Sequence, residues 1–413
     1  MKITPVKGTR DYLPKEMEIR DYLQAVISET YQDAGFSHIA TPILEDAANL
    51  DKSEGGENLN LIFKVLKRGQ QLAACLEGGE VTERALSDMG LRYDLTLPLS
   101  RYFANNRNEL LTPFKVLQMD RVYRAERPQK GRLREFTQCD IDIIGNPSSE
   151  AEVELILTTA KALKRIGITD FQVKINDRRI LKSLFSYAGF AAEDNEKLSI
   201  VFDKLDKIGI EGVRNELLES GFATLSVEAF IKLFESGALT LDSVAKVCDA
   251  EYVDSLRSII DTVNAVAKGD FPVVFTPSLV RGQGYYTGTI FEVEADGYSG
   301  AVAGGGRYDH LIGKFLNEDV PAVGFSIGFE RIFGILMERG AQFPGRKKRI
   351  AVFYDSPSYV QALCYAEELR SSYRVSVLER PKKLGKCLSK LEAQGFDGFA
   401  VYGQEDGVKL FSE

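Results

Sequence analysis

The sequence predicts an α/β protein of the α+β type, in which an antiparallel sheet is interrupted by a helical segment and followed by a small α/β domain. Residues 89–145 alternate short β-like runs with turns, and residues 180–267 show helical periodicity almost throughout. Strand-like and helix-like segments alternate after residue 349. A chain of 413 residues also exceeds the size at which one hydrophobic core stops growing, so we expect two or three domains.

The N-terminal region is expected to form a helix followed by a strand. Apolar residues recur every three or four positions from Met17 to about Ala34, and Gly35 is expected to end this helix. Residues 36–42 read as a strand that stops at Pro42, because proline has no N–H to donate to a sheet. Helix, strand and proline are therefore predicted in this order.

The sheet is expected to resume after the helical segment. A β-pattern runs from Val273 to Val293 and returns around residues 304–306, before a helix predicted from about Phe325 to Glu338. A turn-rich basic linker follows. The last domain is expected to contain a strand, a helix and a strand, at residues 350–354, 359–369 and 375–378.

Composition excludes several classes of protein. The chain is 44% hydrophobic and 27% charged, with no apolar run of about 18 residues and no signal peptide, so we expect a soluble, cytoplasmic protein that does not enter a membrane. The five cysteines lack C-x-x-C spacing, and the only histidines are His38 and His310, which disfavours zinc sites and Ser-His-Asp chemistry. The net charge of -8 argues against indiscriminate binding of nucleic acid.

Alternating polar and aromatic residues between positions 134 and 142 mark a candidate site. They are Arg134, Phe136, Gln138, Asp140 and Asp142, which share one face if the segment is a strand. On this pattern alone, the solvated face of an antiparallel strand is an equally good interpretation. Just upstream, the turn-like segment 124–132 is rich in Arg and Lys, whose charge and donor geometry suit phosphate groups. The two segments together predict a site for a polyanion.

Two further segments carry chemistry. Asp94 and Thr96 would share one face of a strand, where a carboxylate and a hydroxyl could hold an ammonium group. Residues 280–288 combine closely spaced glycines, which allow a backbone to approach a ligand, with Arg281 and two tyrosines. The glycine spacing and the strand-like residues that follow do not fit a dinucleotide-binding loop, whose glycines open a helix.

Together these segments resemble the motifs of the class II histidyl-tRNA synthetases. Motif 2 is matched by residues 124–138, the two histidine-specific elements by 280–288 and 304–311, motif 3 by 324–331, and motif 1 by the N-terminal helix, strand and Pro42 with residues 5–11. The resemblance is dense over residues 1–340 and loose beyond. Its main departure is Gln283-Gly284, where the family has Leu-Asp.

The resemblance implies a set of site residues. The residues implied for ATP are Arg124, Glu126, Arg132, Phe136, Arg281 and Arg331, of which Arg124 and Arg281 are catalytic. Arg124 would grip the α-phosphate and Phe136 would stack on adenine, while Arg281 would stand in place of a metal ion. The residues implied for histidine are Asp94, Thr96, Gln138, Asp142, Tyr285, Tyr286 and Tyr308. No protein ligand for a metal is assigned, and Mg²⁺ is expected to accompany ATP.

The resemblance also implies domains and partners. An antiparallel-sheet catalytic core is expected at 1–175 and 269–340, a helical insertion at 176–268, and a short anticodon-binding-like α/β domain at 348–413. The implied partners are tRNA(His), L-histidine, ATP and a second copy in a homodimer. The basic clusters 346–349 and 380–383 could touch tRNA phosphates, although solvated surface charge explains them equally well.

Two alternatives to a charging enzyme remain open. A non-catalytic paralogue that regulates the ATP phosphoribosyltransferase of histidine biosynthesis shares this fold, but it would be expected to lose the arginines at 124, 281 and 331. The Gln283-Gly284 departure and the short last domain keep this alternative open. A ligase that adenylates another acid would not need the whole set of histidine-binding residues.

Overall fold

The chain forms two compact units. The computed structural model describes residues 3–51, 60–78, 81–129, 131–235, 239–281, 284–341, 347–404 and 406–411. One unit comprises Met1–Arg10 and Leu23–Arg339, and the other comprises Asp11–Tyr22 and Gly340–Glu413. No helix in these described ranges is long and apolar enough to cross a membrane.

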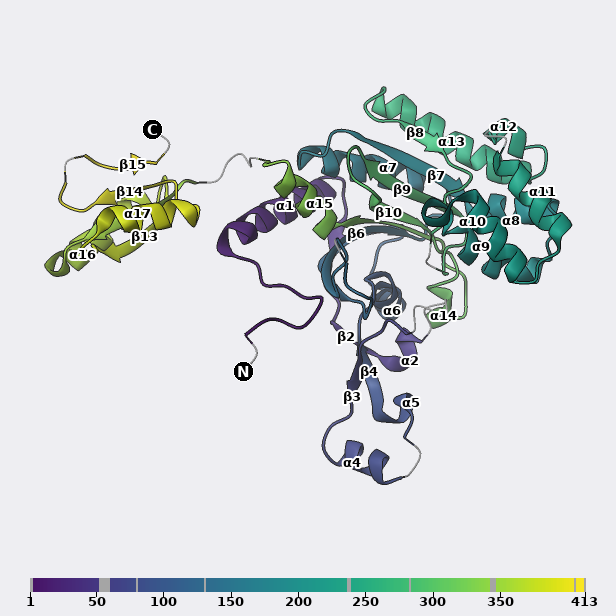
Figure 1. Cartoon of the computed structure of the whole chain (residues 1–413), viewed down its shortest axis with the longest axis horizontal. Helices are drawn as coiled ribbons and strands as arrows, with labels where there is room; N and C mark the ends of the chain where they lie inside the picture. The colour runs from purple at the N-terminus through teal and green to yellow at the C-terminus, as the bar shows by residue number, and fades with distance from the viewer. Residues whose placement is uncertain are drawn as a thin grey trace. The chain divides into compact units, whose positions relative to one another are not determined.

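Among the described residues, the larger unit is built on an eight-stranded sheet (Figure 1). In spatial order its strands are β1 (Ser37–His38), β5 (Phe114–Tyr123), β6 (Glu135–Ile144), β11 (Ala322–Gly328), β10 (Ala301–Arg307), β9 (Thr289–Ala295), β7 (Phe171–Asp177) and β8 (Val273–Phe275). Neighbouring strands are antiparallel, except for the parallel pairs β1/β5 and β7/β8 at the two edges. The predicted antiparallel sheet is confirmed.

Helices cover both faces of this sheet. The helices α7 (Glu150–Arg165) and α15 (Phe329–Glu338) pack against the strands on one side, and α6 (Thr96–Asn106) lies on the other (Figure 1). The helix α1 (Pro14–Asp33) begins earlier than predicted and ends before Gly35, whose φ of 85° favours glycine. The side of α6 is the one that carries the candidate site.

The segment between β7 and β8 is helical, as its periodicity predicts. Its elements are α8 (Arg178–Tyr187), η1 (Ala192–Asp194), α9 (Asn195–Phe202), α10 (Leu205–Glu219), α11 (Thr224–Glu235), α12 (Leu241–Val244) and α13 (Ala250–Ala267). Phenylalanines form its core, with the ring of Phe230 5.0 Å from Phe185 and 5.1 Å from Phe202. The boundaries of this segment as a separate domain stay a prediction.

Three local predictions need correction. The helix predicted from Phe325 begins at Phe329, because the preceding residues form β11. This strand lies between β6 and β10 and is buried on both faces, so its apolar run has no two-residue alternation to distinguish it from a helix. The β-pattern predicted from Val273 to Val293 is interrupted between β8 and β9, whereas the glycine run 304–306 lies inside β10, as predicted. The first strand is limited to Ser37–His38 at the sheet edge.

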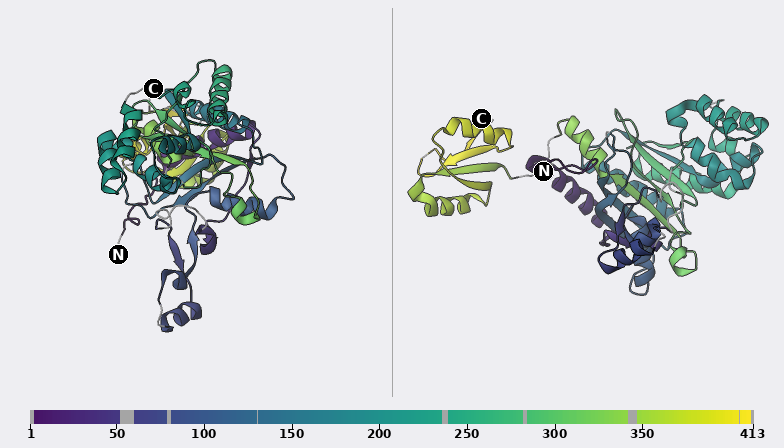
Figure 2. Two further views of the ribbon diagram at one scale, coloured as in Figure 1. Left: turned by 90° about the vertical axis from the view of Figure 1, so that its right-hand side faces the viewer. Right: turned by 60° about the horizontal axis from the view of Figure 1, so that its bottom comes forward.

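A second, three-stranded sheet projects from the larger unit. It has the order β2 (Leu44–Asp46), β4 (Ser87–Leu91), β3 (Lys64–Leu66) among the described residues. The short helices α2 (Ala47–Leu50), α4 (Gln70–Glu77) and α5 (Glu83–Leu86) accompany it. Figures 1 and 2 show this sheet extending away from the main sheet, with α4 at its tip. The helix α14 (Gly313–Leu316) lies beside α6.

The smaller unit contains the α/β arrangement that the last segment predicts. Its described strands are ordered β13 (Arg374–Glu379), β12 (Arg349–Tyr354), β14 (Gly398–Val401), β15 (Lys409–Leu410), with η2 (Ser356–Ser358), α16 (Tyr359–Leu369) and α17 (Leu384–Ala393). The predicted strand, helix and strand correspond to β12, α16 and β13. The first half of the basic linker, up to Arg346, lies outside the described residues.

Candidate active site

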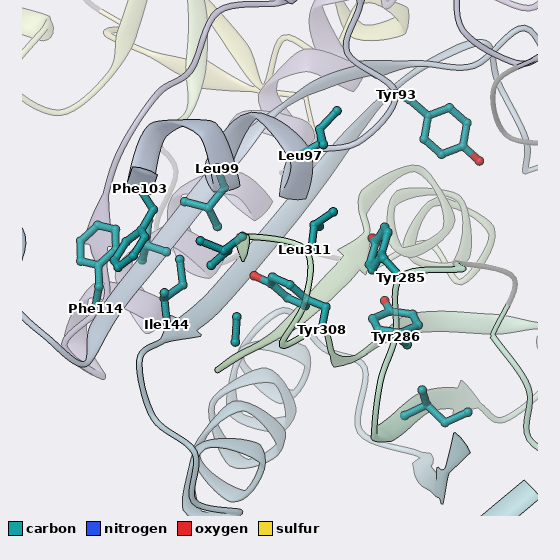
Figure 3. Close-up of a cluster of buried hydrophobic side chains, with 14 of the residues drawn as sticks. Tyr93, Leu97, Leu99, Phe103, Phe114, Ile144, Tyr285, Tyr286, Tyr308 and Leu311 are labelled. Atoms are coloured by element: carbon teal, nitrogen blue, oxygen red, sulfur yellow. The ribbon is translucent and has the colours of Figure 1, made fainter. Parts of the chain in front are cut away.

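Three tyrosines from two segments meet beside α6. Tyr285 and Tyr286 lie in the loop between β8 and β9, and Tyr308 follows β10. The ring of Tyr285 is 5.0 Å from that of Tyr286 and 5.9 Å from that of Tyr308. Figure 3 shows the three side chains together, next to Leu311. All three are buried, so their hydroxyls are held in a site screened from bulk water.

The strand β6 presents an acidic face to these tyrosines. Asp142 is buried, and its Oδ1 accepts a hydrogen bond of 2.6 Å from the hydroxyl of Tyr308. Burial raises the pKa of Asp142 to about 7, against the opposing effect of the Tyr308 bond and with a further increase from Asp94. Gly324 of β11 is paired with Asp142, and a Cβ there would lie 1.9 Å from Asp142 Oδ1. The missing side chain at position 324 therefore makes room for the carboxylate.

Asp94 and Thr96 do not lie on a strand, which corrects the sequence-based interpretation. They stand at the start of α6, where Asp94 Oδ1 accepts a 3.1 Å hydrogen bond from the backbone N–H of Leu97. A two-residue spacing occurs in both settings, and here the carboxylate satisfies an N–H of the first helical turn. The hydroxyl of Tyr285 lies 3.5 Å from Asp94 Oδ2. The pair therefore still reaches the tyrosine site.

The structure brings the predicted histidine-binding residues together as a buried set. Each is at most 9% exposed, and the set comprises Asp94, Thr96, Gln138, Asp142, Tyr285, Tyr286 and Tyr308. The position Gln283, where the family pattern is broken, lies outside the described residues.

The hairpin between β5 and β6 carries an arginine stacked on two rings. The guanidinium of Arg124 lies 4.3 Å from the ring centroid of Tyr93 and 5.0 Å from that of Phe136. Glu126 is 3.9 Å from Arg124 Nη1 and 3.6 Å from Arg132 Nη1, measured from its carboxylate oxygens. Phe136 therefore offers an aromatic surface beside two arginines, which suits a base attached to phosphates.

Two more arginines concentrate positive charge near this hairpin. Arg281 forms an ion pair with Glu292 of β9, and Arg331 of α15 donates to the carbonyl of Ala301. Burial lowers the pKa of Arg331, and the charges of Arg132 and Arg281 act in the same direction. Arg331 therefore experiences the positive charges of Arg132 and Arg281, and a bound anion would offset this repulsion. The arrangement is suited to hold a polyphosphate.

Sequence reasoning missed a residue that holds the tyrosine loop. Arg178, the first residue of α8, donates through Nη1 to the carbonyls of Gly284 at 3.1 Å and Tyr286 at 2.9 Å. Its backbone N–H also donates to the carbonyl of Gly288. An arginine at a helix start reads as solvated charge, and its carbonyl partners lie more than a hundred residues away. Glu292 was missed for the same reason, because strand alternation does not reveal a distant partner.

A cavity opens beside this loop. Its volume is about 220 Å³, and the basic side chains of Arg178, Lys182, His310 and Lys314 line it together with the tyrosine loop. No cluster of three or more His, Cys, Asp or Glu side chains suited to a metal ion occurs among the described residues.

Sequence comparisons match most of the chain. A family model described as histidyl-tRNA synthetase matches residues 8–332. A histidine–tRNA ligase of Leifsonia xyli subsp. xyli is 41% identical over 96% of this chain and 95% of its own length. A histidine–tRNA ligase of Porphyromonas gingivalis is 36% identical over 97% of this chain and 92% of its own length.

Solved structures agree with the fold. A histidyl-tRNA synthetase from Nostoc superposes with a TM-score of 0.76 at 25% identity, covering 97% of this chain and 91% of that one. A Bacillus halodurans protein, described as an ATP phosphoribosyltransferase regulatory subunit/histidyl-tRNA synthetase, gives a TM-score of 0.77 at 20% identity, covering 97% and 98%. The second likeness concerns the fold alone.

Proposed function

The chain belongs to the histidyl-tRNA synthetase family, and we propose that its buried site carries out the ATP-dependent charging of tRNA(His) with L-histidine. In this reaction a histidine carboxylate oxygen bonds to the α-phosphorus of ATP, and the bond to the pyrophosphate leaving group breaks. The resulting histidyl-adenylate then transfers its acyl group to a ribose hydroxyl of the terminal adenosine of the tRNA and releases AMP. The observation that carries this proposal is the meeting of a buried carboxylate and tyrosine site with an arginine cluster.

We assign histidine to the buried set beside α6. The carboxylate of Asp142 would accept from one imidazole nitrogen, and the hydroxyl of Tyr286 would donate to the other, which suits the neutral ring. Tyr308 holds Asp142 in place through its 2.6 Å bond. Asp94, with Thr96 and Gln138, would receive the α-ammonium group. The negative charge of this set complements the ammonium group of the substrate.

We assign ATP to the arginine side of the site. Phe136 would stack on adenine opposite Arg331, and Arg124 would bind the α-phosphate beside Glu126 and Arg132. Arg281 would stabilise the negative charge that develops on the α-phosphate during attack, so this chain contributes positioning and electrostatics. Mg²⁺ is expected to enter with the phosphates of ATP as part of the substrate.

The regulatory-paralogue alternative has less support. One structural neighbour carries that description in part of its name, at 20% identity. The relatives above 30% identity that match nearly the whole chain are described as histidine–tRNA ligases. The presence of Arg124, Arg281 and Arg331, which a paralogue without catalysis would not need, also supports the enzyme.

Histidine-dependent ATP–pyrophosphate exchange, measured beside charging of bulk tRNA with labelled histidine, tests this function. We expect both activities. Exchange without charging would assign adenylation to the chain and contradict tRNA charging with the tRNA used. Histidine binding with neither activity would favour the regulatory paralogue. Exchange that depends on another amino acid would overturn the assignment of the substrate.

Gly304→Ala should lower exchange at least tenfold while the fold persists. A Cβ at position 304 would lie 2.4 Å from Arg281 Nη1, and the end of a flexible side chain can move away. The guanidinium would then leave the position where negative charge develops on the α-phosphate. Loss of one such preorganised group lowers the rate by about tenfold or more. Gly334→Ala is the matched control, since a Cβ there would meet no atom within 4 Å apart from its chain neighbours and the backbone of its own helix. Equal kcat in both variants would contradict the placement of Arg281.

We propose that the protein is a homodimer. Apolar side chains are exposed on the three-stranded sheet and the N-terminal segment, including Leu44 at 49%, Leu66 at 55%, Ile3 at 96% and Val6 at 71%. Such groups favour a protein partner over water. Light scattering should give about twice the chain mass of 45.9 kDa, and Leu44→Asp should shift the mass toward that of one chain. A native mass near that of one chain would refute the dimer.

We further propose how the chain divides its work. Residues 1–175 and 269–340 would form the catalytic core, 176–268 an insertion, and 348–413 a short anticodon-binding-like domain. The cluster 380–383 would contact tRNA phosphates. The cytoplasm, where ATP and tRNA are available for protein synthesis, is the proposed location.

A further inference from the structure

The two ends of the Gln138 amide have different surroundings, because its nitrogen has hydrogen-bond partners and its oxygen has none among the described residues. Its Nε2 lies 3.0 Å from the hydroxyl oxygen of Ser326 and 3.3 and 3.4 Å from the two carboxylate oxygens of Asp140. Its Oε1 is buried and has no hydrogen-bond partner among the described residues. Gln138 is only 8% exposed, so this bare acceptor is costly unless a ligand satisfies it.

The neighbouring strands explain why the amide points this way. Asp140 lies two residues along β6 from Gln138, and Ser326 of β11 is paired with Asp140. The hydroxyl oxygen of Ser326 accepts from Gln138 Nε2, and the interaction of Ser326 with Asp140 lowers the pKa of that carboxyl group. When Asp140 is ionised, as a bound cation would favour, its carboxylate accepts hydrogen bonds and cannot donate them. A reversed amide would place Oε1 against the carboxylate, and both hydrogen bonds would be lost.

Other groups near Asp140 do not replace this contact. Gln118 of β5 is paired with Asp140, but its Nε2 donates to the carbonyl of Leu95 and its Oε1 accepts from Thr41. Burial and the neighbouring charge of Asp142 raise the pKa of Asp140. A cation bound nearby would favour the ionised form of Asp140. An ammonium group would provide this cation and also donate to the bare Oε1.

We infer that Asp140 and Ser326 are positioning residues that hold the Gln138 amide with its carbonyl oxygen toward the α-ammonium group of the substrate. This inference rests on the proposed function for the assignment of Gln138 to histidine. Asp140 and Ser326 thereby make recognition specific for an amino acid, because a ligand without the ammonium group leaves Oε1 bare. Neither residue needs to touch the imidazole or the reacting phosphate.

Calorimetric binding of two ligands to the full chain tests this inference. The ligands are histidine and imidazolepropionate, which is histidine without its amino group. Ser326→Ala removes the acceptor for Gln138 Nε2, and we expect roughly a tenfold loss of affinity for histidine. Asp140→Asn offers an amide donor to Oε1, which permits the reversed orientation, and we expect a loss of tenfold to about a hundredfold. Affinity for imidazolepropionate should change less than about twofold in both variants.

The variants separate orientation from charge. Asp140→Asn also removes a negative charge that attracts an ammonium group directly, whereas Ser326→Ala removes no charge. Ser326→Thr keeps the hydroxyl and should retain most of the affinity for histidine. In exchange assays, Ser326→Ala should raise KM for histidine and leave KM for ATP and kcat nearly unchanged.

Two results would overturn the inference. The first is unchanged histidine affinity in Ser326→Ala, whether or not Asp140→Asn loses affinity, and the second is an equal loss of affinity for both ligands. If Asp140→Asn does not fold, Ser326→Ala and Ser326→Thr still decide. Failure of the proposed function would give a different result, because the wild-type protein would then lack histidine-dependent exchange. The binding comparison between the wild-type protein and its variants could still be made, provided that the wild-type protein binds histidine.

Discussion

Replacement of Arg281 by alanine should reduce histidine-dependent pyrophosphate exchange about a hundredfold or more, the effect of losing ~3 kcal/mol of transition-state stabilisation. Glu292 holds the guanidinium of Arg281 by an ion pair. The Nε of Arg281 is buried and has no hydrogen-bond partner among the described residues. A donor kept in place before the substrate arrives can stabilise charge that develops on the α-phosphate. The loss should fall mainly on kcat, with smaller changes in KM.

The control for this experiment is a second arginine with an acidic partner. Arg257 forms an exposed ion pair with Asp242, and its replacement by alanine should leave exchange unchanged. Near-normal exchange in Arg281→Ala would refute the catalytic role of Arg281. A loss that appears only in KM for ATP would assign Arg281 to binding of the ground state.

Asp142→Asn should reduce kcat/KM for histidine by about a hundredfold, because the neutral amide replaces a charge-assisted bond to the imidazole with a weaker one. The change keeps the shape of the side chain and an oxygen that can accept from Tyr308. Exchange measured at varied histidine, with ATP saturating, gives this ratio. The assignment of Asp142 to the imidazole would be wrong if histidine kinetics were unaffected.

The same variant should be more stable than the parent protein at alkaline pH. The pKa of Asp142 is raised to about 7 in the folded chain, compared with about 3.9 when unfolded. Between about pH 4 and pH 7 the folded state therefore binds more protons than the unfolded state. The stability contributed by protonated Asp142 is fully present below pH 4 and is lost as pH rises through 7. Since asparagine does not ionise, Asp142→Asn should exceed the parent at pH 8 by up to about 4 kcal/mol.

Denaturant unfolding at pH 4.5 and pH 8 measures this difference. The stability advantage of Asp142→Asn should be small at the lower pH and larger at the higher one. Asp242→Asn, on a side chain that is 82% exposed, is the control and should show no such pH dependence. Parallel behaviour of Asp142→Asn and the parent would mean that the carboxylate is not penalised by burial.

Local periodicity predicted the parts of the site that lie on one strand. Gln138, Asp140 and Asp142 share a face of β6 because side chains alternate along any strand. The same spacing misled at Asp94, where a carboxylate at the start of α6 also falls two residues before a hydroxyl. Periodicity describes one element at a time, so it could not distinguish these settings.

Contacts between distant segments were beyond reach of the pattern. The hold of Arg178 on the tyrosine loop depends on how α8 begins beside β9, which no neighbouring residue reveals. Ser326 became relevant only through its pairing with Asp140 across β11 and β6. The family resemblance identified the residues that meet ligands more fully than those that hold them in place.

Three glycines set a limit on redesign of the site. A Cβ would lie 2.4 Å from Arg281 at Gly304, 2.9 Å from Tyr286 at Gly306, and 1.9 Å from Asp142 at Gly324. At these three positions only backbone lies beneath the functional side chains, so no smaller residue can be introduced there to enlarge the site. A library of variants meant to accept bulkier imidazole analogues should therefore vary the aromatic residues Tyr285, Tyr286 and Tyr308 and leave these glycines constant. Any new specificity would have to come from side chains that cover the sheet.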